Sequence, residues 1–208
     1  MFYLFPNAVS KEGCEKLLEY CINNTNFIEA SVLNTGDNAV DINDGRNDPS
    51  IRKTDIAFVT PDGQKDNKVN EIAWYFLEEA NKILFNYKIT SFQPVQFARY
   101  RDGGHYGWHQ DSTGIRPGGE TRKLSLTFAL TDAKTYEGGE LEFYNGERPE
   151  NDIPISDGTK ILGSQVKKNI RAQGSIIVFD SRDFHRVTSV TSGTRYSIVC
   201  WSVGPNFI

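Results

Sequence analysis

Cysteine, net charge and long apolar runs are all scarce in this chain of 208 residues, and each scarcity excludes a class of protein. The three cysteines form an odd and sparse set, and Cys14 and Cys21 share one face of a predicted helix, so we expect buried, reduced thiols. No apolar run approaches the roughly 20 residues that span a bilayer. The formal net charge of −4 argues against general nucleic-acid binding, which relies on clustered lysine and arginine.

The first residues, Met1–Pro6, also lack the charged segment and the cleavage site of a signal peptide. They therefore predict a short strand over residues 2–5, which ends at the proline. Together with the reduced thiols, this pattern favours a cytoplasmic protein without membrane contact.

What the chain does contain is typical of a globular protein: 38% hydrophobic and 12% aromatic residues. Its length suits one domain, and no proline- or serine-rich linker divides it. We therefore predict a single domain over residues 1–208, with an N-terminal support (1–93) and a β-rich part (94–204). In the support, the spacing of apolar residues predicts a helix from Ser10, as N-cap, to Cys21 and a longer helix over 66–85 packed outside a sheet.

Strands dominate the rest of the chain. Short β-branched and aromatic runs alternate with turn residues, which indicates an antiparallel sandwich or barrel. The fold class expected is mainly β with flanking α-helices. The predicted strands cover 51–59, 94–100, 106–111, 124–130, 141–144, 169–171, 175–180, 185–190 and 195–203.

A polar segment rich in turn formers, residues 34–49, superficially resembles a calcium-binding loop. Measured back from Gly45, however, the first ligand position holds Val40 and the last holds Ile51, neither of which can bind calcium. We interpret the segment as a surface loop and a candidate lid. The loops expected to shape the opening through which substrate enters are residues 31–62, 112–121 and 145–167. Three basic residues near this opening suggest either an acidic or phosphorylated partner or simply a solvated loop: Arg116, Arg122 and Lys123.

Histidine occurs three times, and all three copies fall in two segments. On a strand, alternate side chains share a face, so His109 and Asp111 point the same way. His185, 76 residues later, can complete a set of two imidazoles and one carboxylate. Three ligands on one face leave open positions, which suits ferrous iron that also binds a cosubstrate and O2.

Other ligands and another metal fit less well. His105 shares strand parity with His109, but Gly103 and Gly104 suggest a turn, so we expect a supporting or solvent-facing role. Asp183 is a rival carboxylate, although it lacks the His-x-Asp spacing. Zinc also binds two histidines and a carboxylate, but a hydrolytic zinc site does not need a buried arginine ten residues past the last ligand.

That arginine is Arg195, whose guanidinium can clamp a carboxylate through two hydrogen bonds. Ser197 lies two residues along the same strand, on the same face, and can donate a further hydrogen bond. The pair fits the distal carboxylate of 2-oxoglutarate. The alternative is that Arg195 forms an ion pair with one of the 27 acidic residues.

At these residues the chain resembles the iron(II)/2-oxoglutarate-dependent dioxygenases, in their prolyl 4-hydroxylase-like branch. The matched residues follow the family's order over about 110 positions, from Pro94 to Gly204. They are Tyr100-x-x-Gly103-x-x-Tyr106-x-x-His109-x-Asp111, Gly138-Gly139-Glu140-Leu141-x-Phe143, the run Gly174–Phe179, and His185 with Arg195-Tyr196-Ser197.

The resemblance implies a double-stranded β-helix (jelly-roll) core in which His109, Asp111 and His185 bind iron and Arg195 binds the 5-carboxylate of 2-oxoglutarate. It also implies that Tyr100 helps to hold the cosubstrate and that Ser125, where relatives carry threonine, lines the same site. Tyr106 and Trp201 are lining candidates, or ordinary core. No chemistry is assigned to Gly138 and Gly139.

Two departures from the family pattern narrow the resemblance. Collagen-type prolyl hydroxylases usually carry lysine where Arg195 stands, so the chain looks closer to bacterial and phage hydroxylases of the same branch. The location expected is then the cytoplasm of a bacterium or of an infected host cell. Nucleic-acid demethylase relatives carry a second arginine where this chain has Trp201, which weakens a base-repair function.

The activity implied is hydroxylation of an unactivated C–H bond, most simply in a peptidyl-proline-type substrate. It consumes O2 and converts 2-oxoglutarate to succinate, with ascorbate as an accompanying reductant. The alternatives are an oxygenase of a small molecule and a non-catalytic, metal-binding member of the fold. The sequence leaves the oligomeric state open.

Overall fold

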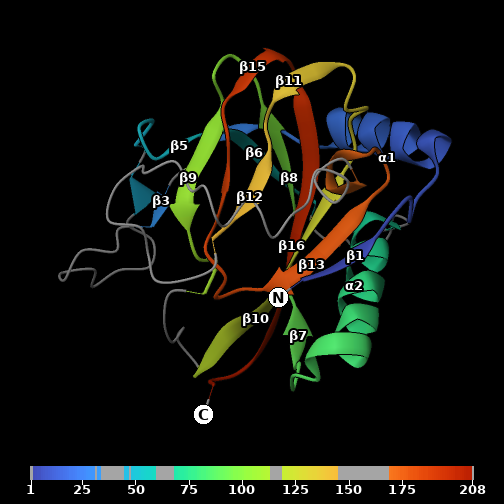
Figure 1. The fold of residues 1–208 in the computed structure, drawn as a ribbon, viewed down its shortest axis with the longest axis vertical. Helices are drawn as coiled ribbons and strands as arrows, with labels where there is room; N and C mark the ends of the chain where they lie inside the picture. The colour runs from blue at the N-terminus through green and yellow to red at the C-terminus, as the bar shows by residue number, and fades with distance from the viewer. Residues whose placement is uncertain are drawn as a thin grey trace.

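Two β-sheets face each other in the computed structural model, and two helices cover the outer side of the larger sheet (Figure 1). The structure describes residues 2–30, 32–33, 45–46, 48–59, 68–112, 119–144 and 169–207. The candidate lid at 34–49 and most of the loops at 31–62, 112–121 and 145–167 lie outside these ranges. Among the described residues, no helix is long and apolar enough to cross a bilayer.

The larger sheet has eight strands and carries both chain ends. Seven of them follow the order β1-β13-β10-β16-β8-β6-β2, and β7 pairs with β16. Their bounds are β1 Phe2–Phe5, β13 Ile176–Asp180, β10 Glu120–Ala129, β16 Arg195–Pro205, β8 Val95–Tyr100, β6 Asp55–Val59, β2 Ile28–Glu29 and β7 Ser91–Phe92.

The smaller sheet has four strands in the order β12-β14-β9-β5. They are β12 Leu141–Phe143, β14 His185–Val187, β9 His105–His109 and β5 Arg52–Lys53. Two further pairs stand apart: β11 (Tyr136–Gly138) with β15 (Val190–Gly193), and β3 (Val32–Leu33) with β4 (Gly45–Arg46). Facing antiparallel sheets of this kind confirm the mainly β, jelly-roll fold with supporting helices.

Two helices support the larger sheet. The helix α1 (Lys11–Asn24) begins as predicted at Ser10, whose hydroxyl accepts a hydrogen bond from the amide of Gly13. The helix α2 (Lys68–Ala80) continues into a π-helical turn, Asn81–Phe85. Near its start, the buried amide of Asn70 bonds the backbone of both Val59 and Val95, which ties α2 to two strands.

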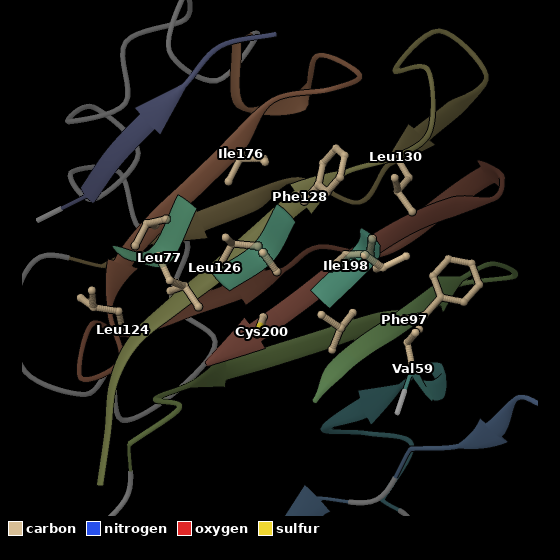
Figure 2. Close-up of a cluster of buried hydrophobic side chains, with 14 of the residues drawn as sticks. Val59, Leu77, Phe97, Leu124, Leu126, Phe128, Leu130, Ile176, Ile198 and Cys200 are labelled. Carbon is tan, nitrogen blue, oxygen red and sulfur yellow. The ribbon is translucent and has the colours of Figure 1, made fainter. Parts of the chain in front are cut away.

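Strand alternation separates the two faces of the larger sheet. On the outer face, Leu124, Leu126 and Ile198 pack with Leu77 of α2 in one buried cluster (Figure 2). The residues between them point toward the smaller sheet, so a single strand serves the helix-covered core and the site at once. The cysteines Cys14, Cys21 and Cys200 are free and buried in the outer cluster, as predicted, and burial raises the pKa of Cys21 to about 12.

Several predicted elements are wrong in detail. Residues 169–171 are helical rather than extended. The strand predicted over 51–59 is interrupted at Thr54, and the one over 185–190 divides into β14 and β15. In each case the break allows the chain to pass from one sheet or strand pair to another, which a local propensity cannot reveal.

Candidate functional site

The two histidines of the predicted triad meet because β9 and β14 are neighbours. In this antiparallel pair, His109 lies directly opposite His185, and Val187 lies opposite Tyr106. Three residues of β9 therefore span the same length as two of β14, which is a β-bulge. The bulge brings Tyr106 and His109 to the same inner face, where their rings stack with centroids 3.5 Å apart.

Asp111 lies two residues beyond the end of β9 and completes the group. One ligand atom from each of His109, Asp111 and His185 lies within 4.8 Å of the others. The Nε2 atoms of both histidines lie 3.6 Å from the carboxylate of Asp111, one from each oxygen. At this length the contacts are not hydrogen bonds, so both Nε2 atoms face the carboxylate across a gap that a cation fits.

The hydrogen bonds behind the imidazoles fix their orientation. Nδ1 of His109 lies 2.8 Å from the carbonyl oxygen of Gly107, and Nδ1 of His185 lies 2.9 Å from that of Asp183. Because a carbonyl oxygen only accepts, each Nδ1 carries the proton and each Nε2 keeps its lone pair for a metal. The residues therefore fit a cation with two nitrogen ligands and one carboxylate.

The electrostatics favour the metal-binding protonation states. Burial, reinforced by the neighbouring His185, lowers the pKa of His109 and keeps its imidazole neutral. Burial opposes the charge of Asp111, but the adjacent rings of His185 and His109 when protonated, the charge of Arg122 and the hydrogen bond from Ser125 together more than offset it and hold the pKa of the carboxyl below its usual range. Ligands must be deprotonated before they bind a metal, so the protein is prepared for it at neutral pH.

The carboxylate of Asp111 is held from behind by the strand β10. Ser125 is fully buried, and its hydroxyl donates to Asp111 Oδ2 over 2.7 Å and lies 2.9 Å from the hydroxyl of Ser181. Arg122, three residues earlier, reaches the Asp111 carbonyl oxygen at 3.4 Å. Ser125, predicted to line the cosubstrate site, thus contacts a predicted metal ligand directly.

The predicted cosubstrate residues lie on adjacent strands of the larger sheet. Arg195 is opposite Tyr100 in the β16–β8 pair, and the guanidinium carbon lies 5.1 Å from the ring centre. Nη1 of Arg195 donates to the hydroxyl of Ser197 over 3.0 Å. Within the described ranges, buried Arg195 makes no ion pair, unlike the acid-paired alternative considered from the sequence.

Comparison with known proteins decides the family. A family model described as the 2OG-Fe(II) oxygenase superfamily matches residues 95–203, slightly more than half of the chain. The chain belongs to this superfamily. Iron, rather than the zinc considered as an alternative, is the metal that membership implies, with 2-oxoglutarate and O2 beside it.

Curated relatives of the chain include proteins named as hydroxylases. A PKHD-type hydroxylase from Acidovorax ebreus is 37% identical over 112 residues, which is 52% of this chain and 42% of the relative. One from Teredinibacter turnerae is 34% identical over the same shares. The chain thus spans about two fifths of the length of the curated relatives it matches.

The solved structures that resemble this oxygenase share its fold at low identity. A prolyl-4-hydroxylase from Pseudomonas putida superimposes with a TM-score of 0.63 at 20% identity, covering 97% of this chain and 91% of that one. A viral collagen prolyl hydroxylase from Paramecium Bursaria Chlorella virus-1 gives 0.60 at 19% identity, with 98% and 96% covered. These likenesses confirm the fold of the prolyl 4-hydroxylase-like branch.

Two glycines to which the sequence assigned no chemistry shape the oxygenase site. A Cβ atom on Gly139 would lie 2.8 Å from Cδ of Arg195 and 2.9 Å from Val190. A Cβ on Gly138 would lie only 1.9 Å from the carbonyl oxygen of Ser189. Both have positive φ, so the pair combines a turn with a close approach to the arginine.

The remaining predicted residues have mixed outcomes. Trp201 is buried under the guanidinium of Arg122, at 3.7 Å, and so lies beside the site rather than in the outer core. Lys123 is 4% exposed and lies over the ring of Phe207. Arg122 and Lys123 therefore belong to β10 rather than to a solvated loop, while Arg116 lies outside the described residues.

The rejected ligands lie apart from the metal group. The strand β9 begins at His105, directly after a turn at Asp102 and Gly103 close to the predicted one, and the bulge removes the parity that His105 would share with His109. Its ring nitrogens lie near the carbonyl oxygens of Gly103 and Ser50. Asp183 contributes its backbone carbonyl to His185 rather than its side chain.

One residue near the site was missed from the sequence. Arg52 lies on β5 opposite Tyr106, and its guanidinium carbon is 4.4 Å from the ring centre. A signal was present: Arg52, Thr54 and Ile56 occupy alternate positions, and all three are buried. An arginine among the inward-facing positions of a strand indicates a candidate site residue.

Proposed function

We propose that this chain is an Fe(II)- and 2-oxoglutarate-dependent dioxygenase that hydroxylates an unactivated C–H bond of a peptidyl-proline-type substrate. The substrate, O2 and 2-oxoglutarate would give the hydroxylated product, succinate and CO2. The observation that carries the proposal is the buried group of His109, Asp111 and His185, whose ligand atoms face one another without hydrogen bonds between them.

The names of similar proteins support the substrate class. Prolyl hydroxylases recur among the structures that share the fold, and one from Trichoplax adhaerens was solved with a peptide fragment bound. The peptide bound to that protein supports, for this chain, a peptide as the substrate.

The chain's own residues would position the reactants. Iron, when bound, supplies the activation of O2 and the oxidation of the C–H bond. His109, Asp111 and His185 would hold it, and Ser125 keeps the carboxylate of Asp111 in place. Phe179 packs edge-on against His185 with centroids 4.7 Å apart, and this apolar wall excludes water from one side of the ligand.

Arg195 would anchor the far end of the cosubstrate. A bidentate contact to the 5-carboxylate of 2-oxoglutarate would satisfy a guanidinium that now has only Ser197 as a hydrogen-bond partner among described residues. The hydroxyl of Ser197 accepts from Arg195, so its own proton is free to donate to the same carboxylate. Tyr100 flanks the guanidinium and shields it from solvent.

Succinate formation tests the function directly. With ferrous iron, 2-oxoglutarate, air and ascorbate as reductant, the protein should release succinate, slowly even without its substrate. His109→Ala and Asp111→Ala should abolish this release, because each removes one of three metal ligands. Arg195→Ala should instead raise the KM for 2-oxoglutarate by about a hundredfold, as expected for loss of a charged, bidentate contact.

The outcomes separate the alternatives. Succinate release that survives His109→Ala would contradict the metal assignment. Tight binding of ferrous iron without any turnover of 2-oxoglutarate would indicate a non-catalytic metal-binding protein. A search of the host's peptides and small molecules for products gaining one oxygen atom then distinguishes a peptide substrate from a small molecule.

A further inference from the structure

Arg52 presents its side chain on the same face as the metal ligands. It pairs with Tyr106 across the β5–β9 ladder, and side chains of directly opposed residues lie on one face of a sheet. The bulge in β9 brings His109 to this face as well. Tyr106 contacts both, since its ring lies 4.4 Å from the Arg52 guanidinium carbon and 3.5 Å from the His109 imidazole centre.

The side chain of this arginine is largely buried and has no acidic partner among the described residues. Arg52 is 8% exposed, and its Nε atom is inaccessible to solvent and has no hydrogen-bond partner. Within the ranges that the structure describes, its guanidinium also forms no ion pair and no side-chain hydrogen bond, and it lies over the Tyr106 ring.

Three other arginines near the two sheets are paired with acids, whereas Arg195 is the one assigned to the cosubstrate. Arg186 on β14 donates to Glu142 over 2.8 Å, Arg99 donates to Asp55 over 3.0 Å, and Arg171 donates to Glu140. A buried cation without an anion is strongly unfavourable, whereas a charge-assisted pair of arginine and carboxylate is favourable. An anion that binds beside Arg52 would remove this penalty.

We propose that Arg52 binds a carboxylate of the substrate and so selects substrates that carry one near the reacting C–H bond. The inference rests on the proposed function and narrows its substrate class. Planar guanidinium matches carboxylate geometry, and the single ring between Arg52 and His109 keeps the anion close to the metal. The carboxylate can come from a free amino acid, the end of a peptide or an acidic side chain next to the reacting residue.

Matched acids and amides test the proposal on the protein loaded with Mn(II) and saturating 2-oxoglutarate, where binding occurs without turnover. One set of probes is the free L-amino acids and their primary amides. The second is a proline-containing peptide with a free carboxyl end, the same peptide amidated, and a version with aspartate beside the proline. At least one acid should raise the melting temperature or bind calorimetrically at least tenfold more tightly than its amide.

Arg52→Gln and Arg52→Lys then assign the preference to this residue. Arg52→Gln should abolish the discrimination between acid and amide, and Arg52→Lys should retain part of it because the charge remains. Arg186→Gln is the matched control, since it removes an acid-paired arginine of the same sheet and should leave the discrimination unchanged. Which probe responds identifies whether the carboxylate belongs to an amino acid, a peptide end or an acidic side chain.

The stability of the free protein gives a second, independent readout. Because the charge of Arg52 lacks an anion, Arg52→Gln should leave the melting temperature unchanged or raise it. A marked drop would mean that the arginine is structural and would overturn the proposal. Equal responses to acids and amides in the unchanged protein, or no response to any acid, would overturn it as well.

The same measurements separate this inference from the proposed function. Succinate release in the absence of substrate depends on the metal group and on Arg195, so Arg52→Gln should leave it intact. If Arg52→Gln instead weakens binding of 2-oxoglutarate, the guanidinium serves the cosubstrate and the inference is wrong. If succinate release is absent but acids still bind through Arg52, the oxygenase function fails and the carboxylate site stands.

Discussion

The position of the Arg195 guanidinium depends on the absence of a side chain at Gly139. Gly139 leaves room for Cδ of the arginine, and any larger residue would meet it at 2.8 Å. The spacing of His109, Asp111 and His185 allowed the sequence to predict that these three residues come together, because metal binding needs those residue types. Gly139 could not be read in this way, since its importance comes from a strand 56 positions further along the chain.

Gly139→Ala should therefore weaken the use of 2-oxoglutarate. We expect the KM for the cosubstrate to rise by roughly tenfold, with iron affinity unchanged, because the new methyl group displaces Arg195 and leaves the metal ligands in place. Steady-state succinate formation at varied 2-oxoglutarate measures the KM, and calorimetry with Mn(II) measures metal binding.

Gly119→Ala separates this effect from backbone strain. Gly119 also has positive φ, at 75° against 62° for Gly139, but a Cβ there would meet nothing within 4 Å. Gly119→Ala should lose about 1 kcal/mol from backbone strain alone, and Gly139→Ala should lose more because its methyl group also displaces Arg195 and Val190. An equal rise in KM in both would contradict the proposed contact with Arg195.

At the scale of elements, one extra residue in β9 determines which side chains of this strand face the candidate metal site. Regular alternation would group His105 with His109, but the bulge groups Tyr106 with His109 instead. Gly107, within the bulge, is the only local sign of it, and a single glycine in a strand is too common to predict one. The short strands β2 and β7 were missed for a similar reason, because two residues carry no periodicity.

His105→Ala should consequently leave metal affinity unchanged, whereas His109→Ala should reduce it by at least a hundredfold. Among the described residues, the His105 side chain forms hydrogen bonds only with backbone carbonyl oxygens, so its loss should lower stability by about 1 kcal/mol. Calorimetric titration with Mn(II) distinguishes the variants. Loss of metal binding in His105→Ala would show that the bulge does not separate the two histidines in solution.

At the scale of the whole molecule, the fold class was predictable and the strand pairing was not. Short strands with turns between them indicated facing antiparallel sheets, and the resemblance supplied the jelly-roll. The pairing of β1 with β13 joins residues more than 170 positions apart, which local patterns cannot specify. The single domain over 1–208 and the cytoplasmic location stay predictions.

A polar network at the end of β13 links distant segments and should make stability depend on pH. Arg182 donates to both oxygens of Asp180 at 2.9 and 2.6 Å, and the hydroxyl of Tyr87 donates to the same carboxylate. Burial opposes the charge of Asp180, but these hydrogen bonds more than offset it and hold the pKa of the carboxyl below its usual value. The ionised form is therefore bound more tightly in the folded protein than in the unfolded chain.

The contribution of Asp180 should be complete above the ordinary aspartate pKa of about 4 and should disappear as the pH falls through the lower folded value. Asp180→Asn should lower the free energy of unfolding by about 1 to 3 kcal/mol at pH 7, and the difference should shrink below about pH 4. Urea unfolding across this range measures it. In Tyr87→Phe, the free energy of unfolding should keep most of its dependence on pH, because Arg182 remains. If the loss of stability in Asp180→Asn were the same at every pH, that result would contradict the charged network.

The strand β10 connects the helix α2 mechanically to the candidate metal site. Leu124 and Leu126 pack on the helix side in the cluster of Figure 2, and Ser125, between them, holds Asp111 from the opposite side. Leu77 lies on the far side of the sheet from the candidate site. A substitution there can nevertheless shift β10 and so change the orientation of the Asp111 carboxylate, which is hydrogen-bonded to Ser125. Mutations selected for thermal stability in this cluster should therefore also change the affinity of the candidate site for iron. Second-site mutations that compensate for a misplaced Asp111 side chain should map to the helix-covered face of the sheet.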